Sequence, residues 1–284
     1  RKVPARIVAV RGGPDAPEAS QPSVAALDAL LADPDVVLWV DLDDQGPEAQ
    51  RILEDVFALH PLLVEDTFTP APTPKIEDFD DYLYLTVHGL APGAGGEREV
   101  HTADLDFFLG ERFLITHHRR SFAALDAAWE AVAEAPALLA AGPAGVLHRV
   151  VDALVDEYLP LMKRLDAEID DIEEAVLRDE SPRLLERIFR MKHSLQRIRR
   201  VGLHQRGVLE RLARGDVALI PAAQRPFFRD VYDHMVRVTD LSDAYRDLMT
   251  SSLDAYLGVQ SHKLNEVMRV LTVFSTIMLP LTFI

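Results

Sequence analysis

Near the C-terminus, one stripe of a long predicted helix carries residues that could guide a cation. Four aspartates spaced by seven begin the stripe, and steps of four and three continue it along mostly small or polar residues: Asp233, Asp240, Asp247, Asp254, Gly258, Ser261, Asn265, Met268, Thr272, Ser275, Leu279 and Thr282. In a ring of identical helices, this stripe could line a central axis that Met268 and Leu271 narrow. Small residues also mark contacts between membrane helices, so tight helix packing is the alternative interpretation.

Acidic residues elsewhere offer weaker signals of a metal site. Glu65 and Asp66 end a strand-like run, where a helix cap or a surface turn is the ordinary interpretation. Asp104 and Asp106 point the same way from a predicted strand, but two carboxylates alone support catalysis weakly. Six more acidic residues surround one predicted helix, which is typical of a solvated face: Asp166, Glu168, Asp170, Asp171, Glu173 and Glu174.

Composition narrows the classes of partner and of chemistry. The chain has 284 residues, a formal net charge of −16, ten histidines and no cysteine. An acidic surface suits cations and disfavours nucleic acid, and a chain without cysteine has no thiolate metal site. The sequence contains no His-Glu-x-x-His motif and no phosphate-binding glycine loop. It therefore predicts neither an enzyme nor an organic cofactor.

The polar stripe requires one very long helix, which we expect over residues 227–284. Pro221 and Pro226 precede it, and no further proline occurs before Pro280. After Arg269 the last fifteen residues carry no charge, whereas a helix that spans a bilayer needs about twenty such residues. We therefore expect the chain to end inside a transmembrane segment.

The preceding sequence predicts a mixed domain followed by long helices. Strands are expected at 6–10, 36–42, 82–90, 103–109 and 112–117, with helices at 23–31 and 48–59, the second ended by His60 and Pro61. Helices at 121–135, 144–177 and 181–214 follow, and the last two are expected to be antiparallel neighbours. The predicted fold class is thus an α+β or α/β domain over 1–120, a helical part over 121–220 and a stalk helix over 221–284 that enters the membrane.

Several segments resemble the CorA family of divalent-cation transporters. They read HPLLVEDT (60–67), PKIEDFDDYLYL (74–85), FFRDVYDH (227–234), YRDLMTSSLDAYL (245–257) and NEVMRVLTVFSTIMLPLTFI (265–284). Members of that family are homopentamers with a large cytoplasmic domain and two transmembrane helices per subunit, and their Gly-Met-Asn selectivity loop follows the first of these helices. The resemblance implies a homopentamer in the lipid bilayer of the cell membrane, with residues 1 to about 269 in the cytoplasm. This orientation also agrees with the positive-inside tendency of Lys263 and Arg269.

The resemblance also assigns roles to individual residues. In the family, acidic residues that match Asp66 and Asp230 meet across a subunit boundary and bind a regulatory divalent ion, and Glu65 and Asp152 match positions near that site. Positions that match Met268 and Leu271 form a hydrophobic constriction of the pore. The expected pore lining is Asp254, Asn265, Met268, Leu271, Leu279 and Thr282.

These observations favour transport of divalent cations. Mg²⁺ is the expected transported and regulatory ion, because oxygen-rich sites without thiolates suit hard ions. Co²⁺ and Ni²⁺ are further candidates for transport. Two alternatives stay open: a zinc transporter of the same fold, and a membrane-anchored oligomeric sensor or structural protein with no pore. A metal-dependent enzyme on a membrane stalk ranks last because no catalytic set is found.

Overall fold

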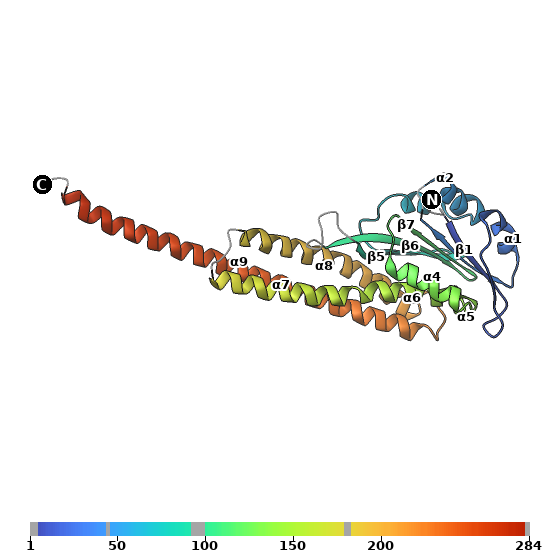
Figure 1. Ribbon diagram of the computed structural model, residues 1–284. Coiled ribbons are helices and arrows are strands. Elements are labelled where there is room, and N and C mark those ends of the chain that lie inside the picture. The colour runs from blue at the N-terminus through green and yellow to red at the C-terminus, as the bar shows by residue number, and fades with distance from the viewer. Residues whose placement is uncertain (1–4, 44–45, 92–99, 179–182, 282–284) are drawn as a thin grey trace. The chain divides into compact units, whose positions relative to one another are not determined.

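The computed structural model describes residues 5–43, 46–91, 100–178 and 183–281 (Figure 1). The chain divides into two compact units. The first consists of residues 1–160 and 197–239, and the second of residues 161–196 and 240–284. The mixed sheet with long helices confirms the predicted α+β fold class.

The first unit is built on a seven-stranded sheet. Its strands are β1 (Ala5–Arg11), β2 (Glu18–Ser20), β3 (Val36–Leu42), β4 (Lys75–Asp78), β5 (Tyr82–Ala91), β6 (His101–Gly110) and β7 (Phe113–His118). They are ordered β2-β1-β3-β7-β6-β5-β4, with β3 and β7 parallel and the other neighbours antiparallel. The apolar runs that predicted β1, β3, β5, β6 and β7 are buried in the sheet, whereas the short strands β2 and β4 lack such runs and were not predicted.

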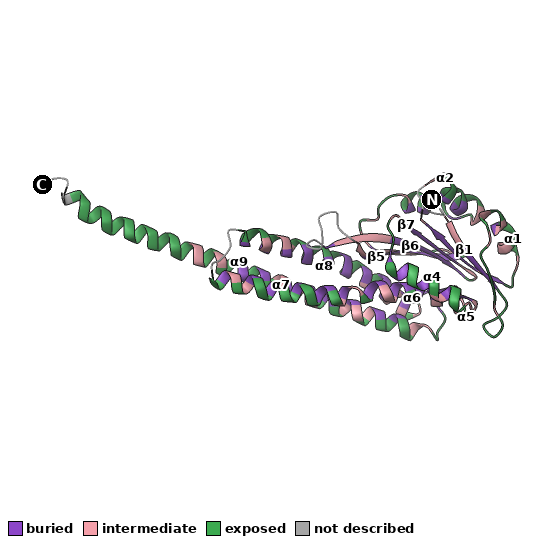
Figure 2. Ribbon diagram, viewed as in Figure 1, coloured by how far each residue is buried: buried purple, intermediate pink, exposed green. Residues whose placement is uncertain are grey.

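Helices cover both faces of this sheet. One face packs against the 3₁₀ turn η1 (Val24–Ala26), α1 (Leu27–Ala32), α2 (Pro47–Arg51), the π-helical turn η2 (Ile52–Val56) and α3 (Pro61–Thr67). The other face packs against α4 (Ala123–Glu134), α5 (Ala137–Ala140) and α6 (Pro143–Asp156). Gly89 of β5 allows the close approach of α6, since a Cβ there would lie 2.6 Å from Leu154 and 2.7 Å from the Phe122 ring. Figure 2 shows the purple, buried residues between these layers.

Several predicted helix boundaries were wrong. The helix expected at 48–59 ends in the π-helical turn η2, and Ala58 then adopts a positive φ of 49°. His60 and Pro61 do not end a helix but begin α3, because the His60 side chain accepts a hydrogen bond from Leu62 N. The helix expected at 144–177 is divided at Glu157 into α6 and α7 (Tyr158–Arg178).

The second unit consists of long helical segments. Helix α7 continues into it from Leu161, α8 (Leu184–Arg214) contributes residues up to Gln196, and α9 (Arg225–Leu281) contributes residues from Asp240. Ser242 of α9 donates a hydrogen bond to the carbonyl oxygen of Leu195 on α8, and Lys192 of α8 donates one to Thr250 Oγ1 of α9. Because the later residue of α9 contacts the earlier residue of α8, the two helices are antiparallel.

Helix α7 also contacts α9, but in the opposite direction to α8. The side chains of Asp166 and Glu173 form hydrogen bonds with Tyr245 and Ser252 of α9, so α7 is parallel to α9. Helix α7 is therefore antiparallel to α8, and this antiparallel direction was predicted. The predicted apolar face of α7 is buried, and most of the six acidic residues around it are exposed.

Helix α9 is a single helix of 57 residues, as the long uninterrupted sequence predicted. From Ser261 to Leu279 every residue is exposed, including many large apolar side chains (green in Figure 2). Within the part of the chain that the structure describes, none of the helices contains a segment that is both apolar and long enough to span a membrane.

Candidate metal centre

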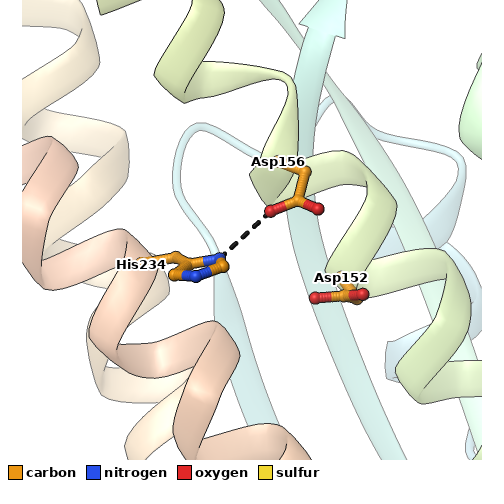
Figure 3. Close-up of side chains that lie close together, drawn as sticks. All are labelled: Asp152, Asp156 and His234. Carbon is orange, nitrogen blue, oxygen red and sulfur yellow. Dashed lines mark hydrogen bonds and ion pairs between the residues drawn. The ribbon is translucent and has the colours of Figure 1, made fainter.

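The candidate metal centre lies where α6 and α9 meet in the first unit (Figure 3). Asp152 and Asp156 are four residues apart on α6, and Asp230 and His234 are four residues apart on α9, so each pair shares one helix face. His148, one further step of four along α6, contacts the rings of Phe227 and Phe228 on α9 at 5.7 and 5.2 Å between centroids. Since Phe228 is fully buried, this aromatic contact fixes the two helices against each other next to the polar side chains.

The polar side chains converge on His234. Its Nδ1 atom lies 3.0 Å from Asp156 Oδ1, and its Nε2 atom lies 3.9 Å from Asp230 Oδ2. One ligand atom from each of Asp152, Asp156 and His234 lies within 4.8 Å of the other two. Asp230 is 72 % exposed, so its carboxylate has room for a further partner.

The electrostatics of the centre suit a divalent cation. Partial burial raises the pKa of Asp152, and the charges of Asp156 and Asp230 raise it further against the opposing effect of His148 and His234. Three carboxylates are therefore crowded around one imidazole, and a cation among them would relieve their repulsion. Carboxylate oxygens with retained water suit Mg²⁺, and the imidazole nitrogen adds a donor that Co²⁺, Ni²⁺ and Zn²⁺ accept readily. The donor set thus fits a divalent ion.

The structure brings together some of the predicted regulatory residues and separates others. Asp152 and Asp230 both lie at this centre. Glu65 and Asp66 lie on another element, α3, and not at the end of a strand as expected. There Asp66 Oδ2 lies 2.5 Å from Lys75 Nζ. A pairing of Asp66 with Asp230 between two chains stays a prediction.

Sequence reasoning missed Asp156 and His234. The available signal was the repeated spacing of four, Asp152 to Asp156 and Asp230 to His234. This spacing indicates that each pair shares a helix face, but it does not indicate that the two faces meet. That contact depends on the packing of α6 against α9, which brings together Asp156 and His234 across a sequence separation of 78.

The predicted pore residues lie on α9. Asp254, Asn265, Met268, Leu271 and Leu279 are all exposed in the single chain, and Thr282 lies outside the described residues. Met268 is 58 % exposed and Leu271 is 56 % exposed, and the other large apolar side chains around them are exposed to a similar extent. Apolar surface of this extent is typical of a surface that contacts another protein or lipid. Their role in a pore stays a prediction.

The chain is similar to known proteins in both sequence and fold. The sequence profile of the family described as CorA-like Mg2+ transporter protein matches residues 34–284. The protein YfjQ of Bacillus subtilis is 30% identical over 253 residues, which cover 88% of this chain and 77% of that protein. The cobalt/magnesium transport protein CorA of Thermotoga maritima is 33% identical over 236 residues, which cover 83% of this chain and 67% of that protein. The solved structure of the full-length CmaX protein has the same fold, with a TM-score of 0.83 and 20% identity over 100% of this chain and 86% of that one.

Proposed function

The chain belongs to the family of CorA-like Mg2+ transporter proteins, and from this premise we propose that it transports divalent cations, chiefly Mg²⁺ with Co²⁺ and Ni²⁺, across a membrane. The family match over residues 34–284 is the observation that carries the proposal, because it includes both the carboxylate–histidine centre and α9. In this proposal residues 1 to about 269 lie in the cytoplasm and the remainder of α9 lies in the bilayer.

The proposed ion path runs along an axis surrounded by copies of α9. Five copies follow from the resemblance to the family, and they would cover the apolar surface that α9 exposes in the single chain. Asp254 would lie at the cytoplasmic end of the narrow part, Asn265 and Thr282 would offer polar contacts, and Leu279 would line the path between them with an apolar side chain. Met268 and Leu271 would form a hydrophobic constriction. Such a ring can block hydrated ions by excluding water.

The proposed regulation uses cytoplasmic Mg²⁺ held between subunits. Asp230 of one copy, with Asp152 near it on α6, would hold the ion together with Asp66 and Glu65 of a neighbouring copy. The exposure of Asp230 supports a cation there, as do the partial burial and the acidic neighbours that together raise the pKa of Asp152. The ion would supply the positive charge that joins the two acidic surfaces. When the cytoplasmic ion concentration falls, the carboxylates repel each other and the subunits can separate, which opens the pore by a shift of population.

Protease sensitivity tests this regulation. Wild-type protein should be protected by millimolar Mg²⁺, and the double variant Asp66→Asn, Asp230→Asn should lose that protection while keeping its fold. Asp171→Asn, at an exposed carboxylate on α7 of the second unit, is the matched surface control. Equal protection of wild type and double variant would contradict a regulatory ion between Asp66 and Asp230.

Ion flux tests the path itself. Replacing Leu271 with Ser should raise leak in reconstituted vesicles by about tenfold or more, because a polar side chain removes the dewetting barrier. The neighbouring change Val270→Ser, on a different face of α9, is the matched control. Unchanged flux in Leu271→Ser, together with cysteine labelling that places position 271 against lipid, would contradict the pore assignment.

The zinc alternative has one specific observation in its favour, the imidazole of His234 in the metal centre. Competition between ions in the same flux assay separates the two functions. Inhibition of Mg²⁺ uptake by Co²⁺ or Ni²⁺ with little Zn²⁺ transport supports the magnesium assignment, and Zn²⁺ transport that Mg²⁺ does not inhibit supports the alternative. A protein that binds the ions but gives no flux would be a sensor without a pore.

A further inference from the structure

Lys75 holds one of the proposed regulatory carboxylates in the single chain. Its Nζ atom lies 2.5 Å from Asp66 Oδ2 and 2.9 Å from Glu77 Oε1. The same ammonium lies 5.0 Å from the centroid of the Tyr84 ring. Lys75 therefore has two carboxylates and one aromatic ring as partners, all from the first unit.

The surroundings of Lys75 fix the position of its charge. Lys75 pairs with Thr86 in the β4–β5 ladder, and Tyr84 is buried with its hydroxyl donating to Asp106 Oδ1 at 3.0 Å. Burial works against a charge on Lys75, but the hydrogen bonds to Asp66 and Glu77 outweigh it and raise the pKa of the amine. The side chain is 31 % exposed, so solvent reaches the ammonium only in part.

Asp66 is nevertheless accessible to an ion. Its side chain is 52 % exposed, and Lys75 occupies its Oδ2 atom, which leaves Oδ1 for another ligand. A divalent cation at Oδ1 would be close to the ammonium of Lys75 and would be repelled by it. Glu77 offers the ammonium a second position, so an arriving ion can displace Lys75 from Asp66 without leaving a charge unpaired.

We propose that Lys75 is a tethered counter-cation of Asp66 that competes with the regulatory divalent ion and so sets the ion concentration at which the subunits are held together. This inference rests on the proposed function, because it takes Asp66 as a ligand of the regulatory ion. In the ion-free state Lys75 neutralises Asp66, and in the ion-bound state Lys75 pairs with Glu77. The exchange of one cation for the other makes the site respond to a higher Mg²⁺ concentration than two unpaired carboxylates would.

The experiment titrates Mg²⁺ against protease protection in variants of the whole protein. Lys75→Met keeps the apolar stem and removes the charge, and it should lower the Mg²⁺ concentration for half-maximal protection about three- to tenfold, since a partly exposed charge near a divalent ion has a modest effect. Lys75→Arg keeps the charge and should stay within about twofold of wild type. Glu77→Gln removes the second position of the ammonium and should raise the midpoint.

A double-mutant cycle assigns the effect to Asp66. In the Asp66→Asn background, Lys75→Met should no longer shift the midpoint of Mg²⁺ binding measured by calorimetry. Thermal unfolding of each variant checks that its fold is kept, and Lys75→Gln replaces Lys75→Met if the latter unfolds.

The outcomes separate this inference from the proposed function. An unchanged or raised midpoint in Lys75→Met, with wild type protected by Mg²⁺, would overturn the competition and leave the regulation intact. If wild type shows no protection, the proposed regulation fails. Equal calorimetric Mg²⁺ affinities of wild type and Lys75→Met would then overturn the competition as well.

Discussion

Asp41 and Asp152 lie in the same unit but in opposite electrostatic surroundings. Asp41, buried in β3, accepts hydrogen bonds at Oδ2 from Arg6 at 2.9 and 2.6 Å and at Oδ1 from Thr116 at 2.6 Å, and His118 Nε2 lies 3.3 Å from Oδ1. Burial opposes its charge, but His118, Thr116 and Arg6 outweigh burial and lower the pKa of Asp41. Asp152 on α6 is only partly buried, yet burial and its acidic neighbours raise its pKa.

The contrast distinguishes Asp41, a carboxylate whose charge supports the fold, from Asp152, a carboxylate that is a candidate for binding a cation. The charge of Asp41 is neutralised within the chain by groups on β1 and β7, so it holds three strands in register. The charge of Asp152 adds to those of Asp156 and Asp230, and the nearby imidazole of His234 is shared among them. A group whose repulsion the chain itself does not relieve is a good candidate for binding an external cation.

The largest expected effect is the loss of stability on replacing Asp41, the buried carboxylate. Asp41→Ala leaves Arg6 and His118 without their carboxylate in a buried position and should lower the free energy of unfolding by about 3–5 kcal/mol. Urea denaturation followed by circular dichroism measures it. Asp126→Ala removes the exposed second partner of Arg6 and is the control, with a loss below about 1 kcal/mol. A loss for Asp41→Ala as small as that of the control would remove the basis of the comparison.

At the candidate metal centre, Asp152→Asn should weaken ion binding without lowering the stability of the fold. Removing one of three crowded carboxylates lowers the charge of the ligand set, so we expect Mg²⁺ affinity to fall by about tenfold. Without the ion, the free energy of unfolding should stay the same or rise by less than about 1 kcal/mol, because a repulsive charge is lost near solvent. Calorimetry and urea denaturation on one preparation measure the two effects. A destabilised fold with unchanged Mg²⁺ affinity would make Asp152 structural.

The pH dependence of stability should carry the signature of His118. Burial lowers its pKa, but Asp41 and Asp43 outweigh burial and raise the pKa above its ordinary value. The stabilisation is therefore complete below the pKa of the unfolded chain, near 6.5, and is lost as the pH rises through the higher pKa of the folded chain. The free energy of unfolding should fall over that interval in wild type, and His118→Gln should flatten the fall. A parallel fall in both proteins would assign it to another group.

The sequence predicted most of the fold because most of the fold is periodic. The apolar runs of β3 and β5 and the uninterrupted stretch of α9 determine their elements locally. Helix α3 was mistaken for the end of a strand because Leu62, Leu63 and Val64 are apolar in succession, and a run that short does not distinguish a strand from a helix.

The candidate metal centre could be predicted only in part, for a different reason. Asp152 and Asp230 came from the family resemblance, whereas His234 and Asp156 depend on which helix faces meet. The pairing of Asp66 with Lys75 likewise depends on how α3 packs beside β4, and β4 has no strong strand signal of its own.

The smallest expected effect on stability concerns His234, whose replacement should change the affinities for different metal ions to different extents. His234→Gln loses an exposed contact with Asp156, so the free energy of unfolding should change by less than about 1 kcal/mol. Mg²⁺ prefers oxygen ligands and retained water, and glutamine offers an oxygen, so its affinity should change by less than about twofold. Co²⁺ and Zn²⁺ gain more from an imidazole nitrogen, and their affinities should fall by about tenfold. Calorimetry with each ion, with His204→Gln as an exposed control on α8, measures the difference. A loss of Mg²⁺ affinity as large as that of Zn²⁺ would mean that His234 positions the carboxylates and does not ligate the ion.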